Sequence, residues 1–191
     1  MITWYYLVIF ILSLMLALSC LLRNKNIDTL FTLLFIAIVV SCMGRYVIAS
    51  STVLEMAIFG NKILYVGGVY APLLTMLVLS RLCAIKVSRL FTIFMALYST
   101  IVFCFVLTIG KSDIYYKSAE LVRENGYSYL VKNYGPMHIL YPIMMVLYAI
   151  SMIVFVIYAF RKKKLYFYTY SFYLEHNMFF HYFDVPFRKT S

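Results

Sequence analysis

Carboxylates are scarce in this sequence of 191 residues, which holds only 7 Asp and Glu against 17 Lys and Arg. None of these acids falls within a long apolar stretch, so the carboxylate relays of proton- or sodium-coupled transport have no candidate. Charged residues make up 13% of the chain and apolar residues 64%. A soluble domain instead carries about 25% charged residues and roughly half apolar ones. The composition therefore predicts an integral membrane protein whose main contact is the lipid bilayer.

Paired cysteines and catalytic groupings are also missing. No C-x-x-C spacing occurs, and each cysteine lies inside or at the inner edge of an apolar segment, which excludes a disulfide framework or a zinc site. No Ser/His/Asp or Cys/His arrangement stands out. The sequence predicts no catalytic residue, no metal and no cofactor. The net charge of +10 comes from short basic clusters beside apolar segments, which does not indicate a nucleic-acid partner. The cysteines are Cys20, Cys42, Cys83 and Cys104.

Five apolar segments are long enough to cross about 30 Å of hydrocarbon. We expect an all-α, polytopic transmembrane bundle within residues 1–164, with spans at about 2–22, 30–49, 62–82, 90–109 and 138–160. Residues 165–191 form a separate tail rich in Tyr and Phe. This tail is either a cytoplasmic or interfacial segment, with its rings at headgroup level, or a disrupted sixth span.

Basic residues gather on one side of these spans. The turns after the first and third spans and the run 161–164 are rich in Lys and Arg and contain a single acid, Asp28. The other two connections mix acidic and basic residues over a greater length. Because Lys and Arg are retained in the cytoplasm, this pattern predicts an outside N-terminus and a cytoplasmic 161–164 run.

The connection 110–137 is expected to form a small extracellular β-hairpin over the bundle. Asn125-Gly126 is the preferred dipeptide for a two-residue type I′ turn. The hairpin serves either as a lid over helix ends or in ligand recognition, since binding residues concentrate on loops held by a rigid scaffold. The expected cross-strand pairs are Val122 with Tyr129, Leu121 with Leu130, and Glu120 with Val131.

Small residues concentrate in the third span. Gly67 and Ala71 stand four apart and share a helical face, which favours close approach of a second helix. Pro72 removes a backbone hydrogen bond and favours a kink in the first turns of this helix. The stretch is either a packing seam or a kinked helix that lines an outward-facing pocket. It also contains Gly68, Tyr65 and Tyr70.

Arg45 lies near the outer end of the second span. An arginine at a membrane centre costs ~3 kcal/mol on insertion scales, but near the interface its head reaches water at much lower cost. Two roles remain open. Arg45 either snorkels or caps a helix end, or it faces the bundle and meets an anionic ligand or a carboxylate, with Glu55 as the nearest acid.

Several of these elements occur in a distinctive order. The third span begins with Tyr65, Gly67 and Pro72, spaced as Tyr-x-Gly-x-x-x-x-Pro. Then follow Leu107-Thr108 at the end of the fourth span, the hairpin-like loop, Tyr134-Gly135-Pro136, and Tyr141 in the fifth span. This order resembles the seven-helix sensor region at the N-terminus of bacterial histidine kinases and diguanylate cyclases.

The resemblance covers about five of the seven helices, residues 1–164. It implies a multi-pass protein of the bacterial inner membrane that takes part in signal input and is not an enzyme. Two further helices and a cytoplasmic output domain follow in that family. No phosphoacceptor box, nucleotide-binding glycine motif or GGDEF-type loop occurs here. We expect either a truncated product or a stand-alone remnant that passes its signal to another protein.

Three functions stay open. The first is a ligand-sensing module that binds an extracellular small molecule or peptide. Binding favours one arrangement of the cytoplasmic end of the fifth span, which passes the signal to a cytoplasmic signalling protein or a homodimer partner. The second is a small transporter or permease-like protein. The third is a structural subunit of a membrane complex, favoured by a lipid-facing Gly67/Ala71 seam, whereas a seam inside the bundle favours the sensor. Candidate ligand-binding residues are Arg45, Tyr65, Tyr70, Tyr134 and His138.

Overall fold

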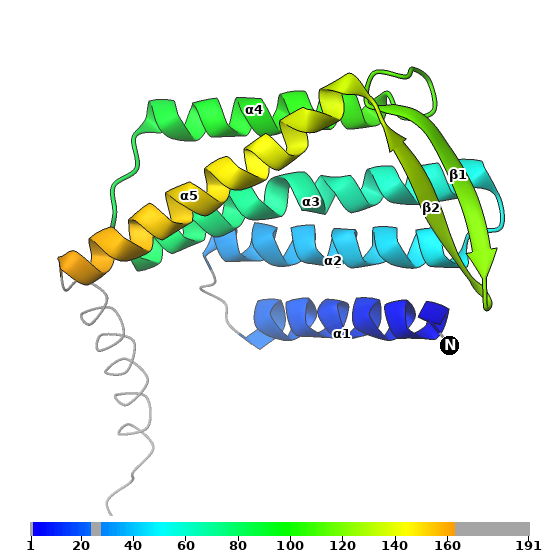
Figure 1. Cartoon of the computed structure of the whole chain (residues 1–191). Coiled ribbons are helices and arrows are strands. Elements are labelled where there is room, and N and C mark those ends of the chain that lie inside the picture. Colours follow the sequence, from blue (N-terminus) through cyan, green and yellow to red (C-terminus); the bar gives the residue numbers. More distant parts are fainter. Residues whose placement is uncertain (1, 24–27, 163–191) are drawn as a thin grey trace, which may run out of the picture.

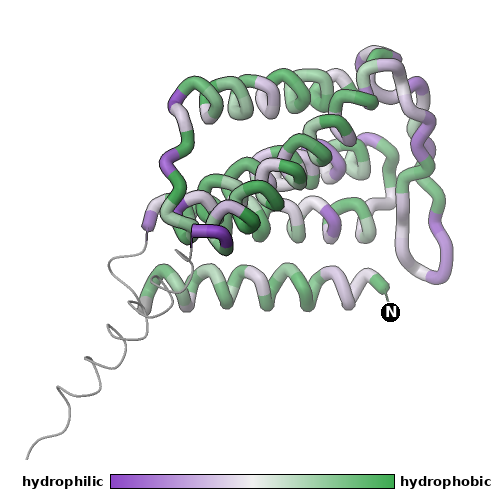
Figure 2. The backbone as a smooth tube through the Cα atoms, turned by 60° about the vertical axis from the view of Figure 1, so that its left-hand side comes forward, coloured by the Kyte–Doolittle hydropathy of each residue, from purple (hydrophilic) through white to green (hydrophobic). Residues whose placement is uncertain are grey.

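Long apolar helices account for most of the computed structural model, which describes residues 2–23 and 28–162. The five helices of this described part are long and apolar enough to cross a membrane, and hydrophilic residues concentrate at their connections (Figure 2). The predicted five-span helical bundle is confirmed. The predicted tail 165–191 and the end of the 161–164 run lie outside the described residues. The helices are α1 (Ile2–Arg23), α2 (Thr29–Ser50), α3 (Leu54–Leu82), α4 (Arg89–Leu107) and α5 (Leu140–Arg161).

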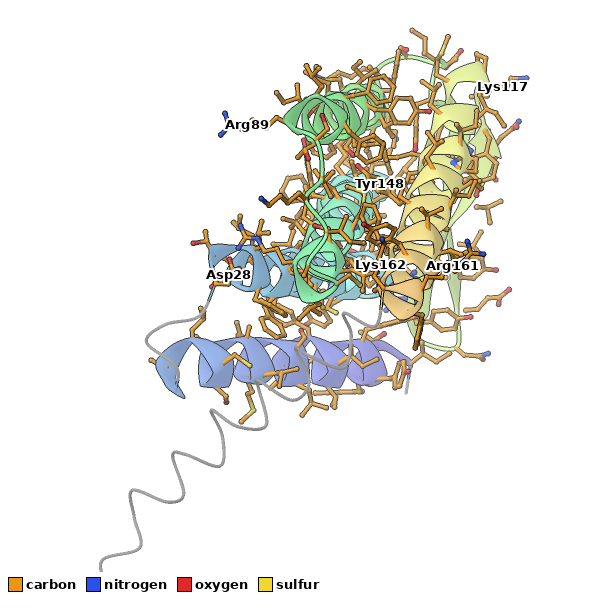
Figure 3. All side chains as sticks on the ribbon, turned by 90° about the vertical axis from the view of Figure 1, so that its left-hand side faces the viewer. Asp28, Arg89, Lys117, Tyr148, Arg161 and Lys162 are labelled. Carbon is orange, nitrogen blue, oxygen red and sulfur yellow. The ribbon has the colours of Figure 1, made fainter. Side chains whose placement is uncertain are left out.

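The first four helices form a row in chain order, and α5 crosses in front of α3 and α4 (Figure 1). Each helix of the row packs on the next, and α5 packs on α3 and α4. The hydrophobic core lies among α3, α4 and α5 and includes Val69, Met95 and Val102. Within this core, the hydroxyls of Ser99 and Tyr148 are 2.6 Å apart, which satisfies two buried polar groups. Figure 3 shows Tyr148 inside the bundle.

One end of the helix row is fixed by Asp28. This residue caps α2 by accepting a 3.0 Å hydrogen bond from the backbone N–H of Leu30, and it also pairs with Arg81 at the end of α3. The Leu30 hydrogen bond, followed by the Arg81 side chain, holds the pKa of the Asp28 carboxyl below its usual range. The two contacts place the start of α2 beside the end of α3.

The third helix begins earlier than expected, at Leu54 instead of 62. Polar residues at Glu55, Asn61 and Lys62 lower the hydropathy of its first turns and hide them from a search for apolar runs. Glu55 lies in the first turn, where a carboxylate interacts favourably with the helix dipole. Pro72 consequently lies in the helix interior, and the expectation that it acts in the first turns is wrong.

The connection between α4 and α5 contains the predicted hairpin. Strands β1 (Tyr116–Glu124) and β2 (Tyr127–Tyr134) pair in antiparallel fashion. Asn125 and Gly126 have φ angles of 49° and 80°, as a type I′ turn requires. A short 3-10 helix, η1 (Pro136–Ile139), then leads into α5. The hairpin and its register are confirmed: Val122 pairs with Tyr129, Leu121 with Leu130, and Glu120 with Val131.

Glycines allow α2 and α3 to approach closely. A Cβ at Gly67 would overlap the Ser41 hydroxyl and the Ala37 carbonyl of α2, and a Cβ at Gly44 would lie 2.8 Å from the Gly60 carbonyl. Such small residues let membrane helices pack backbone to backbone. The Gly67 face is therefore buried within the bundle of a single chain. Of the other expected packing residues, Ala71 and Pro72 are half-buried, and a Cβ at Gly68 would lie 3.3 Å from the Tyr141 hydroxyl of α5.

Candidate functional site

The hairpin lies across one end of the bundle and is tied to it by hydrogen bonds (Figure 1). On β2, the Ser128 hydroxyl donates a 2.6 Å hydrogen bond to the Ser51 carbonyl after α2. At the hairpin turn, the Thr3 hydroxyl of α1 donates to the Gly126 carbonyl at 3.1 Å. Side chains alternate between the faces of a strand. Ser128, Leu130 and Lys132 therefore share the face that meets the helices.

Lys132 is the charged residue of this face. Its Nζ atom donates a 2.8 Å hydrogen bond to Oδ1 of Asn61 on α3. The same ammonium lies 5.5 Å from the ring centre of Tyr116 and 5.8 Å from that of Tyr65, within the range of cation–π attraction. Burial, and then the positive charge of Arg45, lower the pKa of Lys132 to about 8. Lys132 is thus a partly desolvated cation held under the hairpin.

Aromatic side chains surround this cation. The Tyr65 and Tyr116 hydroxyls are 2.9 Å apart, and the Tyr134 ring stacks on His138 with a centroid distance of 3.9 Å. Burial raises the pKa of the Tyr116 phenol, so this group remains a neutral hydrogen-bonding partner at physiological pH. We refer to these residues as the aromatic cluster: Tyr65, Tyr115, Tyr116, Tyr134, His138 and Tyr141.

A pocket of about 380 Å³ opens beside the aromatic cluster, and we call it the hairpin pocket. Small-molecule sites commonly measure about 300–1,000 Å³. Four elements contribute to its wall, and it contains two cations and no carboxylate. The lining residues are Ser41 and Arg45 from α2, Leu64, Tyr65 and Gly68 from α3, Lys132 from β2, and Tyr141 from α5.

Pro72 leaves the backbone carbonyl of Gly68, a residue that lines the pocket, free to accept a hydrogen bond. Proline has no backbone N–H, so the carbonyl of Gly68, four residues earlier, lacks its usual helical donor. The Tyr141 hydroxyl takes that place at 3.5 Å. This contact joins α5 to α3 at the point where the hairpin pocket meets both helices.

The five residues predicted to bind a ligand divide into three groups. Arg45 and Tyr65 line the hairpin pocket. Tyr134 and His138 belong to the aromatic cluster next to it. Tyr70 lies elsewhere, because its ring contacts Phe103 at a centroid distance of 5.9 Å on the α4 side of α3.

A carboxylate partner for Arg45, one of the alternatives left open by the sequence, does not occur in residues 2–23 and 28–162. The ion pair found there joins Asp28 to Arg81. Glu55, the proposed partner, lines a different pocket together with Lys111, Asp113 and Lys117. Arg45 therefore brings a positive charge to the hairpin pocket without a carboxylate to balance it.

Three residues of this site are not among the five that the sequence predicts to bind a ligand. Lys132 was detectable, since it alternates with Ser128 and Leu130 on one face of the predicted strand. Asn61 lies just before the expected start of the third span at 62, and its place in α3 puts its side chain beneath the hairpin. Tyr141 stands in the sequence only as part of the family motif, and nothing local indicates that it faces Gly68. No group of three or more His, Cys, Asp or Glu that would hold a metal occurs in the described ranges.

These features define a polytopic helical membrane protein with an aromatic, cationic pocket under a hairpin at one end. The family model for the N-terminal 7TM region of histidine kinase matches residues 5–174, and the chain belongs to this family. The predicted resemblance to the histidine kinase sensor region is confirmed. The chain is therefore an integral membrane signal-input module, and in histidine kinases this 7TM region is an input module rather than the catalytic domain. Comparison with curated proteins and with solved structures finds no match.

Proposed function

We propose that this chain is a ligand-sensing input module that binds an extracellular small molecule or peptide in the hairpin pocket. The observation that carries the proposal is the composition of the pocket wall. Lys132 from the hairpin, Arg45 from α2, Tyr65 from α3 and Tyr141 from α5 meet around one cavity. A ligand there contacts α2, α3, α5 and the hairpin at the same time.

Signal transfer runs along α5. This helix begins beside the pocket at Leu140 and ends at Arg161 on the opposite side of the bundle. Near the pocket its polar contact with α3 is the long Tyr141–Gly68 hydrogen bond of 3.5 Å. A ligand that competes for the Tyr141 hydroxyl favours one arrangement of α5 over the other, and only such differential binding produces a signal. The receiver is a cytoplasmic signalling domain or a second copy of the chain.

The distribution of charge supports an extracellular hairpin. At the end opposite the hairpin, the α3–α4 connection and the exit of α5 hold a group of basic side chains. Figure 3 shows Arg89 and Arg161 directed away from the bundle. Positive residues beside helix ends remain cytoplasmic. The basic residues of this group are Arg81, Lys86, Arg89, Arg161 and Lys162.

The glycine seam bears on the alternatives. Gly67 packs on α2 of its own chain, so this face is occupied and offers no docking surface to another subunit. The feature that favoured a structural subunit of a larger complex is therefore used inside the bundle.

The test compares ligand binding by the wild type with binding by a variant whose pocket is blocked by a bulky side chain. The full chain in phosphatidylcholine nanodiscs is screened by thermal unfolding against small organic molecules and short peptides. The key variant is Leu64→Trp, which puts an indole into the pocket wall, and its matched control is Leu97→Trp, on a side chain 58% exposed on α4. We expect ligands that stabilise the wild type and Leu97→Trp by several degrees and leave Leu64→Trp unchanged.

A second readout follows the movement of α5. Spin labels at positions 124 and 162 report the distance between the hairpin tip and the end of α5. The ligand should change this distance in the wild type and in Leu97→Trp. Ligands that stabilise Leu64→Trp equally well, or that bind without changing the distance, would contradict the sensing function.

A further inference from the structure

The hairpin pocket has an excess of positive charge. Arg45 and Lys132 both line it, and its remaining lining residues are uncharged. Within residues 2–23 and 28–162 neither cation has a carboxylate partner, since the ion pair found there belongs to Asp28 and Arg81. Two cations that face one low-dielectric cavity repel each other, and an anion between them relieves that repulsion.

Hydrogen-bond donors also exceed acceptors at this site. The Arg45 guanidinium and Lys132 ammonium are donors only. Asn61 is fully buried beside Lys132, and its Nδ2 atom has no hydrogen-bond partner. Its Oδ1 atom already accepts a hydrogen bond from Lys132. In the pocket itself, the N–H groups of Arg45 and Lys132 are matched by a group with several acceptor oxygens.

Carboxylate and phosphate groups have this complementary chemistry. Arginine binds their oxygens in a fork geometry, and lysine adds a point charge. The cavity of about 380 Å³ is larger than a bare ion needs and has apolar surface from Leu64 and Tyr65. It therefore accommodates an anionic group attached to a small organic body.

We propose that the hairpin pocket binds the carboxylate or phosphate group of a small anionic molecule between Arg45 and Lys132. This inference rests on the proposed sensing function and specifies the class of its ligand. The same anionic chemistry is offered by a solute from outside the cell and by a phospholipid headgroup. Arg45 is exposed on α2, so both sources reach it.

The experiment measures thermal unfolding of the full chain in two kinds of nanodisc, with inorganic phosphate as the probe. In phosphatidylcholine nanodiscs, phosphate should raise the unfolding midpoint of the wild type, with a response that saturates. Arg45→Gln and Lys132→Gln should each weaken the apparent affinity at least tenfold. Lys117→Gln is the matched control, because Lys117 belongs to the same hairpin and points into solvent (Figure 3).

A second arm distinguishes the sources. In this arm the nanodiscs contain phosphatidylglycerol and the buffer contains no inorganic phosphate. If the ligand is a solute, the unfolding midpoint of the wild type should stay unchanged. If the ligand is a headgroup, these nanodiscs should raise the midpoint, and Arg45→Gln and Lys132→Gln should remove the rise. Arg45→Lys keeps the charge but loses the fork geometry, so it should retain part of either response and bind better than Arg45→Gln, which separates loss of charge from loss of folding.

Two results would overturn the anion assignment. One is the absence of a saturable response in both nanodiscs. The other is an equal response in the wild type, Arg45→Gln, Lys132→Gln and Lys117→Gln, which is general screening. A neutral ligand that Leu64→Trp excludes, and that Arg45→Gln and Lys132→Gln bind normally, would also overturn it and leave the sensing function standing.

Discussion

The ammonium of Lys132 donates a 2.8 Å hydrogen bond to the Oδ1 atom of Asn61. This contact joins the hairpin to α3 across a sequence separation of 71 residues. Asn61 is fully buried, and a hydrogen bond to a charged group contributes about 1.5–3 kcal/mol. The pair is therefore one of the contacts that hold the hairpin against the bundle, together with the Ser128 and Thr3 hydrogen bonds.

The loss of unfolding free energy on replacing both partners of this pair should be smaller than the sum of the losses on replacing each partner alone. Asn61→Leu leaves the Lys132 ammonium partly buried without its acceptor, and should lower the free energy of unfolding by about 1–3 kcal/mol. Replacement of both partners, in Asn61→Leu with Lys132→Met, should cost clearly less than the sum of the two single changes. Denaturant unfolding of the four proteins gives the coupling energy. The control is Asn133→Ala, at an exposed position on β2, with an expected change within about 0.5 kcal/mol. Additive single changes would contradict the coupling.

Local features of the sequence were sufficient to predict the hairpin. The Asn125-Gly126 turn and the alternation on either side fix its register, because a two-residue turn leaves one way to pair the strands. Apolar length likewise predicts the helices, since every buried backbone group in a membrane is satisfied within a helix.

The composition of the site was less accessible. Arg45 and Tyr65 were selected from their residue types and their places in the spans. The contacts of Lys132 with Asn61 and of Tyr141 with Gly68 depend on how the hairpin and α5 settle on α3, which neither periodicity nor composition specifies. Tyr70 was selected for its closeness in sequence to Gly67, and the rotation of α3 turns it toward Phe103 instead.

Stability should rise with pH because of Lys132. Its pKa is about 8 in the folded chain against an ordinary value of 10.5. Between these values the unfolded chain binds the proton and the folded chain does not, so the free energy of unfolding increases as pH rises through this window. The gain should be on the order of 1–3 kcal/mol. Below pH 8 Lys132 is protonated in both states, so the destabilisation that comes from burying its charge is then fully present.

Neighbouring groups leave that window largely unaffected. The raised pKa of the Tyr116 phenol keeps this group neutral. Unfolding curves between pH 7.5 and 10 should therefore lose most of the rise in Lys132→Met and retain it in Lys117→Met. An equal rise in both variants would assign the effect to other groups.

Two adjacent glycines should differ sharply in their tolerance of a methyl group. In Gly67→Ala the new Cβ overlaps the Ala37 carbonyl of α2, which is backbone and cannot move without shifting the helix. Overpacking of this kind costs about 1–3 kcal/mol. In Gly68→Ala the nearest atom is the Tyr141 hydroxyl at 3.3 Å, the end of a side chain that can adjust. The yield of folded protein in detergent should fall in Gly67→Ala, and further in Gly67→Leu, and stay near wild type in Gly68→Ala. Similar yields for all three would rule out the α2–α3 seam as the reason for a glycine at position 67.

The proposed orientation predicts which end of the bundle is open to the outside of the cell. With the native cysteines replaced by alanine, Glu124→Cys places a thiol beside the hairpin turn, and Lys86→Cys places one in the α3–α4 connection; both positions are exposed. A membrane-impermeant maleimide should label Glu124→Cys in intact cells and Lys86→Cys only after permeabilisation, because the basic residues around Lys86 are retained in the cytoplasm. The reverse pattern would put the hairpin pocket in the cytoplasm. An extracellular ligand would then be excluded, while a cytoplasmic anion or a headgroup of the inner leaflet would still reach Arg45 and Lys132.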